Sequence, residues 1–265
     1  MRTPLVFILL AACALSACNN TDSKNSNVAN RNGNTNSAAV DPGDTKPPVP
    51  SGPVDPNFKA CNPYFPLVPG SRRIYTMLSS SGLTSTATAV VDNWEENGRK
   101  GFKETIRLVD SSGGYQLNQL IERHYVCDGD KVAILYEKTD NNIEGQKSST
   151  EFFYREPSYV MIEPSSLKMG ATWTQSLKTK IQRPGEAPIE MESPTVVEFT
   201  VLNEQEIQLA TGKVKALALY RKVGQAEIND YFVPGLGFVR RNAKEGNKWE
   251  LKEYSGLKPI ETPGK

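Results

Sequence analysis

Hydrophobic and polar positions alternate along most of the chain after residue 57. The alternation is clearest in Val197–Val201 and Trp249–Lys252, where every second side chain is apolar. β-branched and aromatic clusters recur at residues 83–94, 102–109, 120–126, 132–136, 152–154, 159–162, 214–220 and 231–233. Turn-forming pairs such as Asn97-Gly98 and Asp128-Gly129 separate them. Because no long helical periodicity intervenes, the pattern predicts an all-β domain of antiparallel sheet. Residues 116–122 are the segment most open to a helical interpretation.

The domain boundaries follow from composition. Residues 18–57 contain no aromatic side chain and are rich in Asn and Ser, then in Pro, so they cannot form a core. We expect a disordered linker here, which as a flexible chain spans roughly 35 Å. Residues 58–258 form the single antiparallel β domain, and residues 259–265 form a disordered tail.

An export signal occupies residues 1–17. Arg2 precedes a short apolar run, and the run ends in Leu15-Ser16-Ala17-Cys18. This ending resembles the lipobox of bacterial lipoproteins, in which signal peptidase cleaves before a cysteine that carries the lipid. Cys18 is therefore the expected lipidation site. Leu10-Ala11-Ala12-Cys13 also fits the lipobox, but cleavage there leaves a very short hydrophobic region.

Lipidation at Cys18 implies an envelope protein anchored to the membrane by its acyl chains. Asn19 follows the cysteine, which resembles the outer-membrane address of Gram-negative lipoproteins. We therefore expect an outer-membrane location, facing the periplasm.

The formal net charge is only +1. Such a chain has no broad basic field, so nucleic acid is not an expected partner.

Two short motifs carry a further resemblance. Pro66-Leu67-Val68-Pro69-Gly70 and the later Pro234-Gly235-Leu236-Gly237 are similar to motifs of secreted lipoproteins related to the LolA/LolB lipoprotein carriers. The resemblance implies a curved antiparallel sheet, an open half-barrel. Arg73 stands where those families have a Trp, and Gln175 where a second copy of the opening motif would place a Tyr. Leu167-Lys168-Met169-Gly170 is that second copy, a weak internal echo of the first.

Few residues suggest catalysis or metal binding. His124 is the only histidine of the chain, and no nucleophile motif accompanies it. The segment from Asp140 to Glu151 approaches the calcium-loop pattern of EF-hands, yet strand-like flanks favour a polar hairpin. The pairs Arg72-Arg73 and Arg240-Arg241 could contact anionic lipid headgroups, but we favour the interpretation that they are exposed, solubilising residues. We therefore predict no catalytic residue, no metal site and no cofactor.

Two classes of function stay open. The first is a non-enzymatic binding module for an apolar ligand or a lipid-modified protein partner. The alternative is a structural or accessory lipoprotein that docks on another envelope protein.

The remaining cysteines form one possible pair. Cys13 leaves with the signal and the sulfur of Cys18 carries the lipid, so Cys61 and Cys127 are left in an oxidising compartment. We expect a disulfide between them, worth about 4 kcal/mol on the chain-entropy model, in preference to two buried free thiols.

The choice between the two lipoboxes is testable. Cys18→Ala should abolish membrane association, because the acyl chains have no other attachment point, whereas Cys13→Ala should leave it intact. Membrane fractionation of the two variants decides between them. If only Cys13→Ala releases the protein, the lipid is attached at Cys13.

Overall fold

The computed structural model describes residues 45–110, 117–191 and 194–260. The signal, Cys18 and linker residues up to 44 therefore lie outside the described part, as do residues 261–265. Among the described residues, no helix has the length and apolar character needed to cross a bilayer.

Almost all regular structure in the described residues is β-strand. A single 3₁₀ turn, η1 (Pro164–Ser166), is the exception. The strands are β1 (Arg72–Leu78), β2 (Thr84–Glu96), β3 (Arg99–Asp110), β4 (Leu117–Asp128), β5 (Lys131–Ile143), β6 (Gln146–Tyr154), β7 (Tyr159–Met161), β8 (Thr172–Gln182), β9 (Ile189–Glu190), β10 (Thr195–Leu209), β11 (Gly212–Val223), β12 (Ala226–Val233), β13 (Gly237–Ala243) and β14 (Lys248–Ser255).

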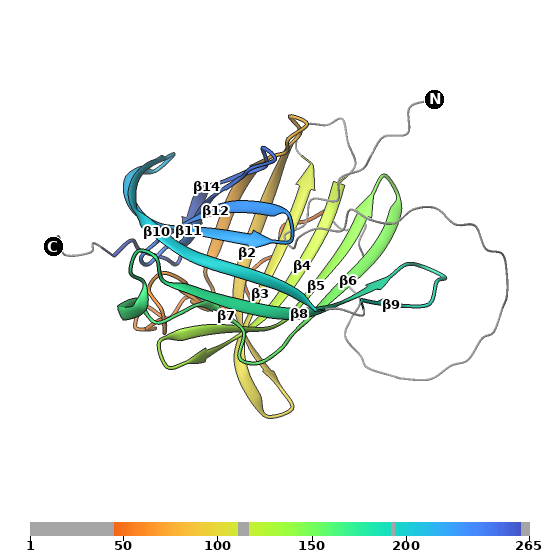
Figure 1. Cartoon of the computed structure of the whole chain (residues 1–265), viewed down its shortest axis with the longest axis horizontal. Helices are drawn as coiled ribbons and strands as arrows, with labels where there is room; N and C mark the ends of the chain where they lie inside the picture. The colour runs from red at the N-terminus through yellow and green to blue at the C-terminus, as the bar shows by residue number, and fades with distance from the viewer. Residues whose placement is uncertain (1–44, 111–116, 192–193, 261–265) are drawn as a thin grey trace.

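Twelve of these strands form a closed antiparallel barrel (Figure 1). Neighbouring strands follow the order β10-β11-β12-β13-β14-β1-β2-β3-β4-β5-β6-β8. Strand β8 also pairs with β10, from Leu177↔Thr195 to Thr172↔Thr200, so the order closes into a ring. Strand β7 pairs with β5, and the short β9 continues the β8 ladder beyond the barrel. The expectation of an all-β antiparallel domain is confirmed, but that of an open half-barrel is wrong. Closure satisfies the two strand edges that an open sheet would expose.

The segment open to a helical interpretation is a strand. From Leu117 onward it belongs to β4, which pairs along its length with β3 and β5. Ile121 faces inward and is fully buried, opposite Ile106 of β3. Two ladders of backbone hydrogen bonds and this burial outweigh the local preference of a Gln- and Glu-containing segment.

A segment before β1 closes one end of the barrel. It is joined to the end of β4 by the disulfide Cys61–Cys127, whose Cα atoms lie 6.2 Å apart. The buried Asn62 side chain donates from Nδ2 to the carbonyl oxygens of Asp130 at 2.7 Å and Ile162 at 2.9 Å. These bonds fix the position from which the chain enters the barrel end.

The two motifs that carry the family resemblance meet at this end. The Gly235 N–H donates to the Pro63 carbonyl oxygen at 2.7 Å. At Gly237, a Cβ would lie 3.0 Å from Pro66 Cδ and 3.1 Å from Arg73 Nη1. Glycine is therefore required here for contact between segments far apart in the chain, as well as for the turn.

Part of the predicted linker packs on the barrel. The Ser51 N–H and hydroxyl both donate to Asp92 Oδ1, at 2.7 and 2.6 Å. At the other terminus, the Ile260 N–H donates to the Pro234 carbonyl oxygen at 2.8 Å. The packed region is therefore wider than residues 58–258 on both sides.

The internal echo in the sequence corresponds to a structural repeat. Gly70 and Gly170 both have φ of +84°, and each N–H donates to a valine carbonyl oxygen at 2.8 Å, Val91 in one case and Val201 in the other. Each turn leads into the first strand of a six-stranded unit, β1–β6 or β8 with β10–β14. The barrel is thus built from two consecutive units of the same topology.

Close approach at Gly235 should make this position sensitive to substitution. A Cβ there would lie 1.9 Å from the Lys258 carbonyl oxygen, and φ is +81°. Gly235→Ala should lower the free energy of unfolding by more than about 3 kcal/mol, because backbone must move as well as adopt a left-handed conformation. Gly82→Ala is the matched control, since φ is +83° with open space around it, and should cost about 1–2 kcal/mol. Equal losses in urea unfolding would contradict this account of the motif.

Candidate functional site

The calcium-like segment forms the hairpin between β5 and β6. Asp140 lies on the outer face of β5, where its carboxylate is 3.0 Å from Lys138 Nζ, while Asn141 points inward to Gln119. Glu151 accepts from the Tyr136 hydroxyl on the outer face. Asp140 and Glu151 are therefore each held by another side chain on the outer face, Lys138 and Tyr136 respectively. Within the described ranges, no group of three His, Cys, Asp or Glu side chains could hold a metal ion.

His124 lies on the outer face of β4, away from the barrel interior. Its ring is 4.6 Å from that of Trp94 and 5.4 Å from that of Tyr136, measured between centroids. Nε2 is 2.8 Å from Glu122 Oε1. A hydrogen bond with His124, reinforced by Lys103, lowers the pKa of Glu122 against the opposing effect of burial. The histidine belongs to an aromatic row on the outer wall.

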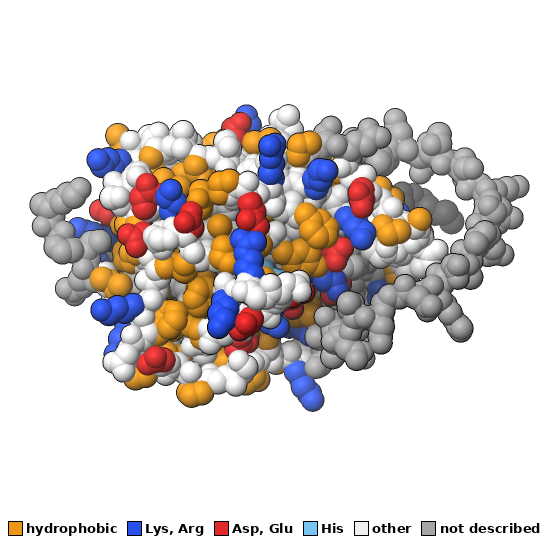
Figure 2. Space-filling view, turned by 90° about the horizontal axis from the view of Figure 1, so that it is seen from below, with side chains coloured by type: hydrophobic (Ala, Val, Ile, Leu, Met, Phe, Trp, Pro, Cys, Tyr) orange, Lys and Arg blue, Asp and Glu red, His pale blue; other side chains and the backbone are white. Residues whose placement is uncertain are grey.

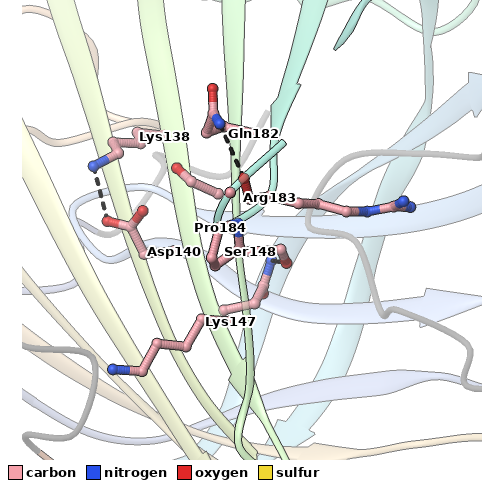
Figure 3. A pocket seen from close by; sticks show the side chains of 10 residues that line it. Lys138, Asp140, Lys147, Ser148, Gln182, Arg183 and Pro184 are labelled. Atoms are coloured by element: carbon pink, nitrogen blue, oxygen red, sulfur yellow. Dashed lines mark hydrogen bonds and ion pairs between the residues drawn. The ribbon is translucent and has the colours of Figure 1, made fainter. Parts of the chain in front are cut away.

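A polar cavity of about 310 Å³ lies at the rim, between the β5–β6 hairpin and the turn after β8 (Figure 3). Lys138 forms an ion pair with Asp140. The side chains of Lys147 and Arg183 point away from each other. Since its cations do not converge, the rim cavity lacks the arrangement of a recognition site.

The barrel interior contains a set of charged side chains, which we call the interior charge cluster. Its members come from seven strands and are Arg73, Glu104, Arg123, Glu137, Arg221, Asp230 and Arg241. Alternation along each strand places them among inward-facing apolar residues. Burying ionised groups is costly unless they are paired, so their partners decide what the cluster can do.

Four of the charged groups form a chain across β1, β3, β4 and β5. Arg73 Nη2 lies 2.9 Å from Glu104 Oε1, and Arg123 Nη1 lies 3.6 Å from Glu104 Oε2. Arg123 Nε donates to Glu137 Oε2 at 2.6 Å. The Tyr125 hydroxyl also donates to Glu104, at 3.3 Å. Two carboxylates are thus shared between two guanidinium groups on this wall.

On the opposite wall, two arginines share one carboxylate. Arg241 binds Asp230 in bidentate fashion, at 2.6 and 3.0 Å, and Arg221 Nε lies 3.4 Å from Asp230 Oδ2. Burial by itself would raise the pKa of Asp230, but attraction to Arg241 and then Arg221 outweighs it and holds the pKa below the usual value. Asp230 is therefore ionised at neutral pH.

Three phenols line the interior beside the cluster, those of Tyr75, Tyr125 and Tyr154, and burial acts on the first two. Burial raises the pKa of Tyr75 to about 12. Burial, and then the Glu104 carboxylate, raise the pKa of Tyr125 well above its usual value. The hydroxyls of Tyr75 and Tyr125 are therefore neutral at pH 7.

The internal repeat relates the two walls. Arg123 and Glu137 are register partners on the fourth and fifth strands of the first unit. Asp230 and Arg241 are register partners on the fourth and fifth strands of the second unit. In both units a bulge adjoins the pair. In the first unit the fourth strand carries the cation and the fifth the anion, and in the second unit the two charges are exchanged.

A cavity of about 120 Å³ lies inside the barrel against the interior charge cluster. Its apolar walls include Phe65, Ile106, Ile134, Val160, Phe199 and Phe232. Among its polar lining atoms, Arg73 Nε, Glu137 Oε1 and Gln175 Nε2 are buried and have no hydrogen-bond partner in the described part of the chain. An apolar chamber with a few buried, unpartnered polar groups is suited to hold a small amphipathic molecule.

Sequence analysis placed the arginines of this site wrongly. Arg73 is 3% exposed and Arg241 faces the interior, whereas both were expected on the surface. Alternation gave a usable signal for Arg73, because Tyr75 and Met77 lie on the same face of β1 and are buried. Cys61 and Cys127 lie at the barrel end rather than at the cavity. Cys18 lies outside the described residues.

Comparisons with known proteins do not identify a family for this chain. No protein-family model matches the chain, and no curated protein matches it either. A solved structure from Bacteroides fragilis, of a protein assigned as exported and having a YmcC-like fold, is 9% identical to this chain. The match covers 74% of this chain and 100% of the other, with a TM-score of 0.43.

The ion pair of the second unit should have a distinctive pH dependence. Asp230→Asn removes the carboxylate that Arg241 binds in the barrel interior, and should cost about 3–5 kcal/mol of unfolding free energy at pH 7. The pKa of Asp230 is lowered in the folded state, so its stabilisation is complete above the unfolded pKa of about 3.9 and is lost as pH falls through the lower folded pKa. The difference between wild type and variant should therefore be constant from pH 7 to 5 and shrink below pH 4.

Urea unfolding at several pH values measures this difference. Asp140→Asn is the control, because it removes an aspartate paired with Lys138 on the outer face and should cost less than about 1 kcal/mol. A loss for Asp230→Asn that is as large at pH 3 as at pH 7 would refute the assignment.

Proposed function

We propose that this protein is an exported, lipid-anchored binding protein that holds a small ligand inside its barrel without chemically changing it. The single observation that carries the proposal is the interior cavity, in which apolar walls surround buried polar atoms that lack partners. The only histidine lies on the outer wall, away from this cavity. The cavity lining therefore offers groups for binding, but no nucleophile next to a general base.

Cavity volume limits the ligand. At about 30 Å³ per water, 120 Å³ corresponds to about four water molecules. Sites for drug-sized ligands are several times larger, at about 300–1,000 Å³. This favours a compact amphipathic ligand over a lipid acyl chain, and the closed barrel departs from the open carrier fold of the LolA/LolB type.

The anchor in this proposal is the lipidated Cys18, with an outer-membrane location facing the periplasm. The lipobox at residues 15–18 and Asn19 support it. A linker rich in Asn, Ser and Pro would let the barrel stand away from the bilayer. The membrane is therefore a proposed partner through the lipid alone.

A second candidate function is docking on another envelope protein, and one observation favours it. Trp94, His124, Tyr136 and Phe153 form a row on the outer wall, with successive ring centroids 4.6, 5.4 and 5.5 Å apart. Phe153 ends the row and is 46% exposed. Exposed aromatic side chains are enriched at protein interfaces. On the face drawn in Figure 2, cationic and anionic side chains are mixed among hydrophobic ones, which suits a protein partner better than nucleic acid.

Native mass spectrometry of the full chain, extracted from membranes in mild detergent, tests the binding proposal. We expect a small molecule of defined mass to remain bound to wild-type protein. Ile106→Phe should remove it, because Ile106 lines the cavity and a larger side chain occupies the ligand volume.

Ile207→Phe is the matched control, since Ile207 is also buried in the barrel core but does not line the cavity. Circular dichroism verifies that both variants fold. Absence of any bound small molecule from wild type, together with cross-linking of a protein through position 153, would favour docking instead.

A further inference from the structure

We propose that the disulfide Cys61–Cys127 is an exchange site for a protein dithiol, and that its reduction releases residues 58–69 as a lid over the interior cavity. We call residues 58–69 the lid segment. This inference rests on the proposed binding function and concerns how the binding site is opened. Three observations carry it: the composition of the cavity wall, the attachments of the lid segment, and the exposure of the disulfide.

The cavity wall is built from barrel strands except at one residue. Phe65 belongs to the lid segment, whereas every other lining residue lies on a strand held by hydrogen-bonded ladders. The ring of Phe65 is 5.3 Å from that of Tyr125 and 6.3 Å from that of Phe232, measured between centroids. Opening the wall at any other point would break a ladder. Phe65 is therefore the part of the wall that can move with the smallest loss of hydrogen bonds.

Few backbone hydrogen bonds hold the lid segment to the barrel. The Pro63 carbonyl oxygen accepts from the Gly235 N–H at 2.7 Å, and Asn62 Nδ2 donates to two carbonyl oxygens, as described above. The next backbone bond from the described chain to a strand is at Gly70, whose N–H donates to β2 at 2.8 Å. Between these anchors, side chains hold the segment in place. The disulfide is its covalent tie to β4.

The lid segment is closed in the oxidised protein. Leu67 is 1% exposed and Tyr64 is 9% exposed, so opening brings apolar surface into water and occurs only as local unfolding. Cross-linking Cys61 to β4 removes most of the conformations that an open segment could adopt. Reduction restores these conformations and makes openings more frequent. The cavity therefore retains its ligand in the oxidised protein and exchanges it in the reduced protein.

The disulfide is accessible to a protein partner. Cys127 is exposed at the end of β4, beside the exposed turn residues 128–130, whereas Cys61 is half-buried. A thiolate of the partner attacks the Cys127 sulfur, the Cys61–Cys127 bond breaks, and Cys61 leaves as a thiolate. The partner's second thiol then resolves the mixed disulfide. The partner is oxidised to a disulfide, and its two protons pass to Cys61 and Cys127, which end as thiols.

Trapping the mixed disulfide tests the exchange site. A thioredoxin whose second active-site cysteine is replaced by serine cannot resolve the intermediate, so it should remain bonded to this chain. The chain carries Cys13→Ala and Cys18→Ala, which leave Cys61 and Cys127 as its only cysteines. Peptide mass mapping should locate the bond at Cys127. A bond at Cys61, or no trapped complex, would overturn the assignment.

Hydrogen exchange measures the lid in the absence of any ligand. Phe65 and Gly235 are the reporters, because the N–H of each donates to a carbonyl oxygen of the lid segment. Reduction of the same variant by dithiothreitol should accelerate exchange at both at least about tenfold, since the cross-link no longer limits local opening. Exchange within β4, at residues 117–123, should be unchanged. Equal rates before and after reduction, or acceleration throughout the barrel, would contradict a lid.

Acrylamide quenching of Trp249 fluorescence measures access to the cavity, because Trp249 lines the cavity and is only 8% exposed. Trp94→Phe and Trp173→Phe remove the other two indoles of the chain. Reduction should raise the quenching constant of Trp249 several-fold. No change on reduction would show that the lid segment does not control access.

Two single substitutions separate the lid from a general loss of stability. Phe65→Ala should raise the quenching constant of Trp249 while the disulfide is intact, because it removes the lid's part of the cavity wall. Phe58→Ala is the matched control. Phe58 also belongs to the lid segment, but its ring packs on Phe102 at 6.0 Å and does not line the cavity. Equal quenching in the two variants would contradict the role of Phe65, and circular dichroism verifies that both fold.

Failure of the lid and failure of the binding function give different results. Unchanged exchange and quenching on reduction, with a small molecule still retained in native mass spectrometry, would overturn the lid and leave the binding function in place. Faster exchange and stronger quenching with no molecule retained would support the lid and overturn the binding function. Where a molecule is retained, the reduced protein should release it faster than the oxidised protein.

Discussion

Each of the twelve barrel strands has a hydrogen-bonded neighbour on both sides, and this condition depends on the pairing of the first strand, β1, with the last, β14. Without that ladder the sheet would have two long edges with unpaired N–H and C=O groups. With it, the inward face of every strand is enclosed. In an open sheet, the charged residues on the concave face would be in contact with water. Closure buries them, so they must form ion pairs and hydrogen bonds with one another.

The repeat explains how closure is reached. Two units of six strands follow each other, and each begins with the same glycine turn, at Gly70 and at Gly170. The last strand of each unit pairs with the first strand of the other, so the ring has two equivalent junctions. Sequence has diverged between the units more than geometry has, and the ion pair of the fourth and fifth strands even has its charges exchanged.

The charged positions of the cluster also differ between the units. Besides the pairs Arg123–Glu137 and Asp230–Arg241, the cluster contains Arg73 and Glu104 in the first unit and Arg221 in the second. Arg73 and Gln175, which differ from the sequence motif they were compared with, also present buried donor atoms that have no hydrogen-bond partner among the described residues. Departure from a structural motif and candidate binding chemistry coincide at these residues.

Sequence alone determined the class of fold, because a period of two in hydrophobicity is a local property that each strand carries by itself. It also identified the cysteine pair Cys61–Cys127, on the expectation that Cys13 leaves with a signal and Cys18 carries a lipid, and it contained the echo of the glycine turn. It did not determine closure, because the pairing of β1 with β14 joins the first and last strands of the barrel and depends on the curvature summed over all strands. Nor did it determine the site. Arg73 and Arg241 look like surface residues in a polar sequence context, and only the tertiary structure turns them inward and assembles them, from strands more than a hundred residues apart, around one cavity.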